Sequence, residues 1–155
     1  MRSLGNQHEI EVFVRFCETD AVGHVNNTSY FLYFEEARTK FFQEIFKERN
    51  QKFNMILASI KCDYLHQAYA SESLIVRTKV IDVGTKSFKL SHELVNKLAR
   101  VPIAYAECVS VCFDYETQQS VPIPEELKQR LHANQMNFAN QTDPISNPCS
   151  GRWEK

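Results

Sequence analysis

The chain has 155 residues, of which 43% are hydrophobic, and its formal net charge is −1 at pH 7. This length and apolar content suit one domain around a single core, and they are too small for two. The nearly neutral charge excludes the basic surface typical of a nucleic-acid-binding protein, and we expect no membrane span because no run of residues is both long and apolar.

The N-terminal segment predicts a cytoplasmic protein, and a first strand follows it. Residues 1–8 lack the apolar core of a signal peptide. Ile10, Val12, Val14 and Phe16 then alternate with polar or charged neighbours. Because this alternation is typical of a strand with one buried face, we expect the four side chains to point into the core.

A polar loop follows the strand and contains Asp20, Gly23, His24 and the pair Asn26 and Asn27. A helix that starts here leaves backbone N–H groups unpaired, and its positive dipole end stabilises a carbonyl oxygen that gains negative charge. Asp20 could then act as a nucleophile or a general base. The structural alternative is that Asp20 and the two asparagines only make turn and N-cap hydrogen bonds.

Helical spacing of apolar residues after the loop predicts a long, broadly apolar helix. The stripe consists of Tyr30, Phe34, Ala37, Phe41 and Ile45, and Phe31, Phe42 and Phe46 widen it. At about 100° per residue, Glu35 and Arg38 fall inside the apolar arc. They could form an ion pair at its edge, or Glu35 could line a site. A helix this apolar needs enclosure, and a curved sheet is the simplest one.

The rest of the chain predicts that sheet. Period-two patterns cover residues 56–64, 74–80, 88–94 and 103–113, and a turn at Gly84 joins the middle two. Pro124 lies at or near the start of a short amphipathic helix, residues 125–131. The order β-α-β-β-β-β plus a short helix makes the fold α+β. We assign residues 1–132 to this domain and residues 133–155 to a polar tail that is mobile or packed on a partner subunit.

Five cysteines are an odd number, and most of them fall in strand patterns, as small buried side chains do in a reducing compartment. Cys108 and Cys112 would lie about 13 Å apart along a strand, too far to share a zinc ion. Cys17 lies near the Asp20 loop, but no neighbouring feature would activate its thiol. We therefore expect neither a metal nor a tightly held cofactor.

The loop and helix together resemble a family signature. Asp20-x-x-Gly-His24-Val-Asn-Asn27-x-x-Tyr-x-x-Tyr-x-Glu35-x-Ala-Arg38 is similar to the motif of hotdog-fold acyl-CoA thioesterases of the 4-hydroxybenzoyl-CoA thioesterase-like group. The resemblance covers about residues 8–131, and the predicted element order is also that of the hotdog fold, a curved antiparallel sheet wrapped around a central helix. It implies an acyl-CoA substrate and a homodimer or homotetramer, which would also cover exposed sheet edges.

The resemblance implies roles for particular residues. Asp20 matches the catalytic carboxylate, and Asn27 begins the helix whose backbone N–H would polarise the thioester carbonyl. Lys86 and Ser87 resemble a segment close to the coenzyme A moiety. The position of Glu35 is acidic in the family as well, so Glu35 stays a candidate. The acyl pocket would be built from the central helix and the facing strands, by residues such as Tyr30, Tyr33 and Tyr64. Because large aromatic residues form cores more often than pocket walls, we do not count them as site residues.

His24 has two interpretations. Plant acyl-ACP thioesterases share the His-Val-Asn-Asn string and include its histidine in their catalytic network, but Val22 stands where they have asparagine. His24 is therefore an acid/base assistant or a structural hydrogen-bonding residue. The alternative functions are an acyl-ACP thioesterase, another hotdog enzyme such as an enoyl-thioester hydratase, and an acyl-CoA-binding module without catalysis.

Overall fold

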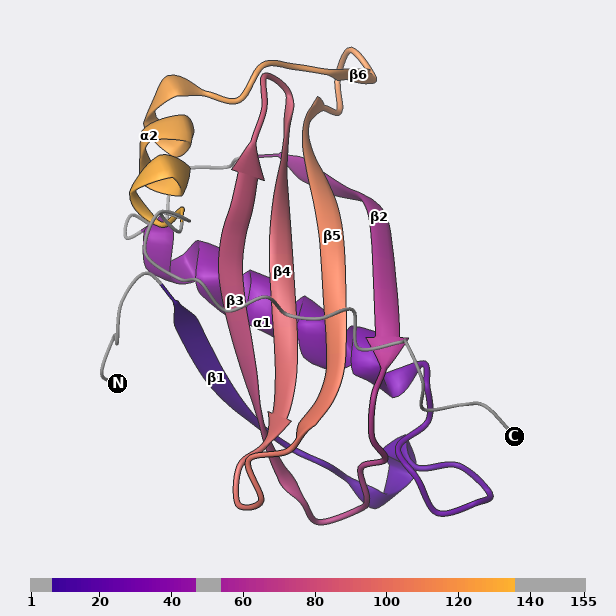
Figure 1. The fold of residues 1–155 in the computed structure, drawn as a ribbon. Helices are drawn as coiled ribbons and strands as arrows, with labels where there is room; N and C mark the ends of the chain where they lie inside the picture. Colours follow the sequence, from indigo (N-terminus) through magenta and orange to yellow (C-terminus); the bar gives the residue numbers. More distant parts are fainter. Residues whose placement is uncertain (1–6, 47–53, 136–155) are drawn as a thin grey trace.

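The computed structural model describes residues 7–46 and 54–135, and in it an antiparallel sheet curves around a long helix (Figure 1). The elements are β1 (His8–Phe13), η1 (Phe16–Glu18), α1 (Ser29–Ile45), β2 (Met55–Tyr64), β3 (Ser73–Val83), β4 (Ser87–Asn96), β5 (Pro102–Asp114), β6 (Gln119–Ser120) and α2 (Glu125–Ala133). The sheet order is β1-β3-β4-β5-β2, with β6 paired to β5. The predicted element order is confirmed, with β6 as an addition.

α1 crosses one face of the sheet and buries an aromatic side against it (Figure 1). Its buried apolar residues are Tyr30, Tyr33, Phe34, Ala37 and Phe41. They recur every three or four positions, which places them on one side of a helix. The predicted apolar stripe is therefore confirmed for Tyr30, Phe34, Ala37 and Phe41, and its first member, Tyr30, lies at the end of α1 that enters from the Asp20 loop. Phe42, Ile45 and Phe46 are half-buried, but Phe31 is 36% exposed, so its prediction as part of the buried face is wrong.

A polar row crosses the sheet under the middle of α1. Cross-strand pairing aligns His8 of β1 with Thr78 of β3, and Thr78 with His92 of β4. The Thr78 hydroxyl lies 3.0 Å from His92 Nδ1, and the Phe34 ring stacks on the imidazole at 5.5 Å. Burial, with a smaller effect from the Arg38 charge, lowers the pKa of His92 to about 3, so the imidazole stays neutral. The row separates two apolar clusters, one at each end of the sheet.

The first strand ends earlier than the alternation predicts. Ile10, Val12 and Val14 are buried as expected, but Phe16 is 85% exposed, so its prediction as a core residue is wrong. Phe16 opens η1 instead, where the Glu18 carboxylate accepts a hydrogen bond from the Arg15 N–H. This local turn breaks the period-two pattern, and it directs the chain toward the Asp20 loop.

β2 is an edge strand, and its side chains are less buried than its alternation predicts. It pairs with β5 alone in the described chain, and the register shifts between Leu57 and Ser59. Ala58 is exposed, Ile60 and Cys62 are half-buried, and Tyr64 is 36% exposed. A bulge turns side chains away from the regular pleat, and the strand has no second neighbour to cover it.

α2 closes one end of the sheet and ties down the end of α1. The Arg130 guanidinium donates a hydrogen bond to the carbonyl of Ile45, the last residue of α1, and pairs with Glu126. Such a contact satisfies a carbonyl that the helix leaves unpaired. α2 extends to Ala133, two residues beyond the prediction. From residue 136 onward, the predicted tail lies outside the described residues.

We expect Phe34→Ala to lower the free energy of unfolding by about 3–5 kcal/mol, because the ring is fully buried between α1 and the polar row. Phe16→Ala is the matched control, and it should change stability by less than about 0.5 kcal/mol because Phe16 is exposed. Urea denaturation of both variants measures this difference. Equal effects would contradict the packing described here.

Candidate active site

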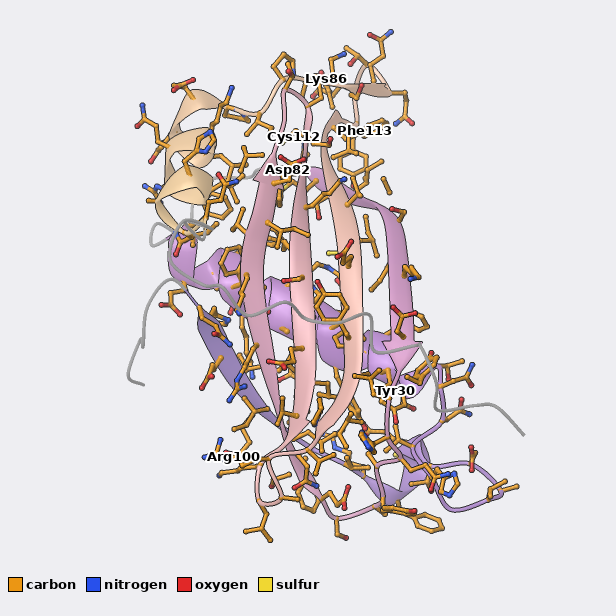
Figure 2. All side chains as sticks on the ribbon, viewed as in Figure 1. Tyr30, Asp82, Lys86, Arg100, Cys112 and Phe113 are labelled. Carbon is orange, nitrogen blue, oxygen red and sulfur yellow. The ribbon has the colours of Figure 1, made fainter. Side chains whose placement is uncertain are left out.

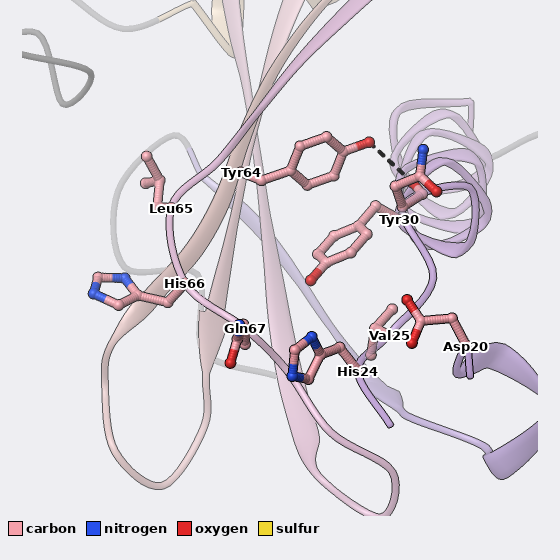
Figure 3. Close-up of a pocket in the computed structure, with 9 residues that line it drawn as sticks. Asp20, His24, Val25, Tyr30, Tyr64, Leu65, His66 and Gln67 are labelled. Carbon is pink, nitrogen blue, oxygen red and sulfur yellow. Dashed lines mark hydrogen bonds between the residues drawn. The ribbon is translucent and has the colours of Figure 1, made fainter. Parts of the chain in front are cut away.

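A pocket of about 390 Å³ opens between the loop that precedes α1 and the end of β2 (Figure 3). Its walls are formed by Asp20, His24, Val25, Asn27, Tyr30, Tyr64, Leu65, His66 and Gln67. Three of the predicted catalytic residues, Asp20, His24 and Asn27, thus line one pocket. The segment that contains Leu65, His66 and Gln67 was missed, because only the folded sheet brings the end of β2 to this loop.

Asp20 is held by a tight turn that leaves one carboxylate oxygen free. Its N–H donates to the His24 carbonyl at 2.8 Å, and its Oδ1 accepts a hydrogen bond from the Val22 N–H at 2.9 Å. Gly23 adopts φ +89°, a conformation that side chains disfavour, to close the turn. Oδ2 accepts no hydrogen bond from any described residue. The predicted turn hydrogen bond is therefore present, and it still leaves an oxygen available for chemistry.

The entrance to α1 exposes a backbone donor. The first helical residue is Ser29 and not Asn27, so that boundary is corrected by two residues. Asn26 explains the shift, because its side chain accepts from the Thr28 N–H at 3.1 Å and its carbonyl accepts from the Ser29 N–H at 2.9 Å. Within residues 7–46 and 54–135, the Asn27 N–H finds no acceptor. The unpaired donor thus lies just before the helix, at a residue that lines the pocket.

Two of the three tyrosines that we expected to build the acyl pocket, but did not count as site residues, form a wall of this pocket. Tyr30 and Tyr64 pack edge to face with their ring centres 5.0 Å apart. The Tyr64 hydroxyl donates to the Asn27 carbonyl at 3.0 Å, a contact visible in Figure 3. This hydrogen bond ties the end of β2 to the helix entrance. Tyr33, the third, does not line this pocket; it is buried, and its hydroxyl donates to Glu18.

His24 faces the pocket from a strand-like contact with the segment after β2. It forms an isolated β-bridge with Tyr69, and its ring packs edge-on against the Tyr69 ring at 5.3 Å. Neither ring nitrogen has a hydrogen-bond partner among the described residues. The imidazole is thus positioned by packing, and the ring nitrogens remain available to a ligand or to water.

Glu35 lies outside the pocket. Its side chain is 63% exposed and pairs with Arg38, whose side chain is 6% exposed. The prediction that both residues lie on the burying face is therefore right for Arg38 and wrong for Glu35. The reason is geometric, because the buried sector of α1 ends between these two positions. The ion-pair alternative is the one that the structure contains.

Lys86 and Ser87 lie at the opposite end of the sheet from the pocket (Figure 2). Tyr64 of β2 pairs with Ala104 of β5, and Ala104 pairs with Leu94 of β4. Tyr64 and Leu94 therefore lie at the same level of the sheet. Ser87 is seven residues further along β4, which is about 24 Å for strand geometry. Neither residue therefore reaches the pocket of its own chain.

The part of the chain that the structure describes holds no group of three or more histidine, cysteine or acidic residues arranged to bind a metal ion. Within the same residues, no helix is both long enough and apolar enough to cross a membrane.

Comparisons with known proteins bear on the fold and the family. The family model of the thioesterase-like superfamily matches residues 14–131. The uncharacterised protein YsmA of Bacillus subtilis is 36% identical over 122 residues, covering 78% of this chain and 82% of its own, and the acyl-CoA thioesterase YbgC of Haemophilus influenzae is 25% identical, covering 83% and 97%. A predicted thioesterase from Bacillus stearothermophilus superposes with a TM-score of 0.76 at 26% identity, covering 84% and 97%. The hotdog fold and the family resemblance are confirmed.

We expect Glu35→Gln to leave kcat/KM unchanged for any thioester that the protein hydrolyses, because the carboxylate is exposed and does not line the pocket. It should lower the free energy of unfolding by about 1–2 kcal/mol, because the buried Arg38 guanidinium loses its carboxylate. Glu36→Gln, which removes an exposed pair with Lys40, is the control and should cost less than about 0.5 kcal/mol. Urea melts and steady-state kinetics measure both quantities, and reduced kcat/KM at unchanged stability would place Glu35 in catalysis.

Proposed function

The chain belongs to the thioesterase-like superfamily, and we propose that it is an acyl-CoA thioesterase that uses Asp20 and the Asn27 N–H. The observation that carries this proposal is their meeting in one pocket, where Asp20 keeps a free carboxylate oxygen and Asn27 keeps a free backbone donor. Thioester hydrolysis needs a carboxylate near the carbonyl carbon and a donor for the carbonyl oxygen. YbgC, named as an acyl-CoA thioesterase, supports coenzyme A as the carrier.

The chemistry follows from these groups. The Asn27 N–H lies at the positive end of α1 and donates a hydrogen bond to the thioester oxygen. It thereby stabilises the negative charge that develops on that oxygen. The free oxygen of Asp20 either attacks the carbonyl carbon, forming an anhydride that water then hydrolyses, or takes a proton from an attacking water. The C–S bond breaks in both routes, the coenzyme A thiolate leaves, and water supplies the new oxygen of the acid. His24, with unbonded ring nitrogens, assists proton transfer in this pocket.

We expect Asp20→Asn to fold normally and to lose about 10²–10⁴-fold in kcat, the usual scale for a positioned acid/base group. Glu9→Gln is the control, because it removes an exposed carboxylate on β1, the edge of the sheet opposite β2, and should leave kcat unchanged. Release of free thiol from a panel of acyl-CoAs measures turnover. Near-normal kcat in Asp20→Asn would exclude this mechanism, and no turnover of any thioester by the unaltered protein would exclude the function.

A homodimer through β2 would bring Lys86 and Ser87 to the pocket. Full antiparallel pairing of two β2 edges sets Met55 of the partner subunit opposite Tyr64, by two-fold symmetry. Ser87 pairs with Val111, and Val111 with Ile56, so Ser87 lies at the Met55 end of the sheet. Each pocket would then lie level with the Lys86 end of the other copy. Lys86 and Ser87 would contact the phosphates of coenzyme A from that subunit.

This arrangement predicts complementation between two impaired variants. Lys86→Ala should raise KM for acyl-CoA with little effect on kcat, because a remote phosphate contact acts alike on substrate and transition state. In a mixed dimer of Asp20→Asn and Lys86→Ala chains, one pocket combines an intact Asp20 with an intact Lys86 from the other chain. We therefore expect low-KM activity to return on mixing. If each Lys86 served its own chain, the mixture would keep the high KM, and a monomer by native mass spectrometry would contradict the dimer.

A further inference from the structure

Tyr30 is a buried residue whose hydroxyl faces the pocket, and nothing in the proposed mechanism uses that hydroxyl. Tyr30 is 4% exposed and lines the pocket, and its hydroxyl has no hydrogen-bond partner among the described residues. Figure 3 shows that this hydroxyl points into the pocket, toward the wall formed by His24 and Gln67. A hydroxyl that faces a pocket is unfavourable if it stays unpaired, so a ligand or water should pair with it.

Tyr30 differs in this respect from the two tyrosines that it contacts. The Tyr33 hydroxyl donates to Glu18 at 2.8 Å, and the Tyr64 hydroxyl donates to the Asn27 carbonyl at 3.0 Å. The Tyr30 ring packs against both of them, with its centre 5.0 Å from that of Tyr64 and 6.3 Å from that of Tyr33. Within this described cluster, the hydroxyl that faces the pocket is the one left without a partner.

The position of the hydroxyl is fixed by its surroundings. Tyr30 is the second residue of α1 and belongs to the apolar cluster under the helix. Burial, with smaller contributions from neighbours that include Asp20, raises the pKa of Tyr30 to about 12, so the phenol keeps its proton at neutral pH. A ligand that enters the pocket therefore meets a neutral, preorganised O–H group beside the Tyr64 ring.

We propose that Tyr30 is a specificity-determining residue whose hydroxyl hydrogen-bonds to an oxygen on the acyl group. The pocket would then prefer acyl groups that carry a hydroxyl or carbonyl substituent over plain alkyl groups of equal length. A plain alkyl group would displace water from the phenol and leave it unpaired. The thioester oxygen accepts from the Asn27 N–H, so the Tyr30 hydroxyl would contact a different part of the substrate. This inference rests on the proposed acyl-CoA substrate.

Matched pairs of substrates test the proposal. The pairs are 3-hydroxyhexanoyl-CoA with hexanoyl-CoA, and hydroxyphenylacetyl-CoA with phenylacetyl-CoA, which place the oxygen at two distances from the thioester. Calorimetric titration on the Asp20→Asn protein measures affinity without depending on turnover. We expect the oxygenated member of at least one pair to bind about tenfold more tightly, equivalent to about 1.4 kcal/mol. Tyr30→Phe in the same background should remove that preference and leave the affinity for the plain member unchanged.

Tyr33→Phe is the matched control, because it removes a phenol on the same helix that is bonded to Glu18 outside the pocket. It should retain the preference. The same pairs are then compared by kcat/KM with Asp20 intact. Tyr30→Phe should again remove the preference, so that both members of a pair have similar kcat/KM. The proposal is overturned if neither pair shows a preference, if Tyr30→Phe keeps it, or if both members weaken equally. Absence of turnover with an intact binding preference would reject the thioesterase function and keep the role of Tyr30.

Discussion

Burial of one face of α1 against the curved sheet is the interaction on which the rest of the structure depends. Phe34 contributes a fully buried ring at its centre, and Tyr30 and Phe41 extend the contact toward the two ends of the helix. Because α1 is fixed along its length, its first turn is fixed too. The pocket can then be built by short segments that add few contacts of their own, namely the Asp20 loop and the end of β2.

Some polar groups of the site form hydrogen bonds that hold the backbone, and others stay free to meet a substrate. Asp20 uses one carboxylate oxygen to shape its turn, and Asn26, one residue before the unpaired donor, uses its side chain and carbonyl to start the helix. Tyr64 adds a hydrogen bond from a different strand to the Asn27 carbonyl. The groups that carry no structural bond are thus positioned by neighbours that do, as preorganised catalysis requires.

Local patterns in the sequence predicted the element order and the Asp20 loop, since both depend on neighbouring residues. The failures occur where a local turn interrupts a pattern or where burial depends on distant partners. Phe16 continues an alternation that the Glu18 turn interrupts, and Glu35 lies at the boundary of a face whose width only packing decides. Tyr30 belongs to the core and also lines the pocket, whereas Tyr64 lines it from the exposed edge strand, a difference that residue type alone does not reveal. The distance of Lys86 from the pocket follows from strand register, which no local pattern encodes.

The neutral His92 beneath α1 makes the fold sensitive to acid. The pKa of His92 is near 3 in the folded protein and near 6.5 in an unfolded chain. Below about pH 6.5, the unfolded state therefore binds a proton that the folded state does not bind. The stability present above that pH then declines as the pH falls from about 6.5 toward about 3. Inactivation in mild acid would therefore report loss of the native structure from its centre, and not a change in the chemistry of the pocket.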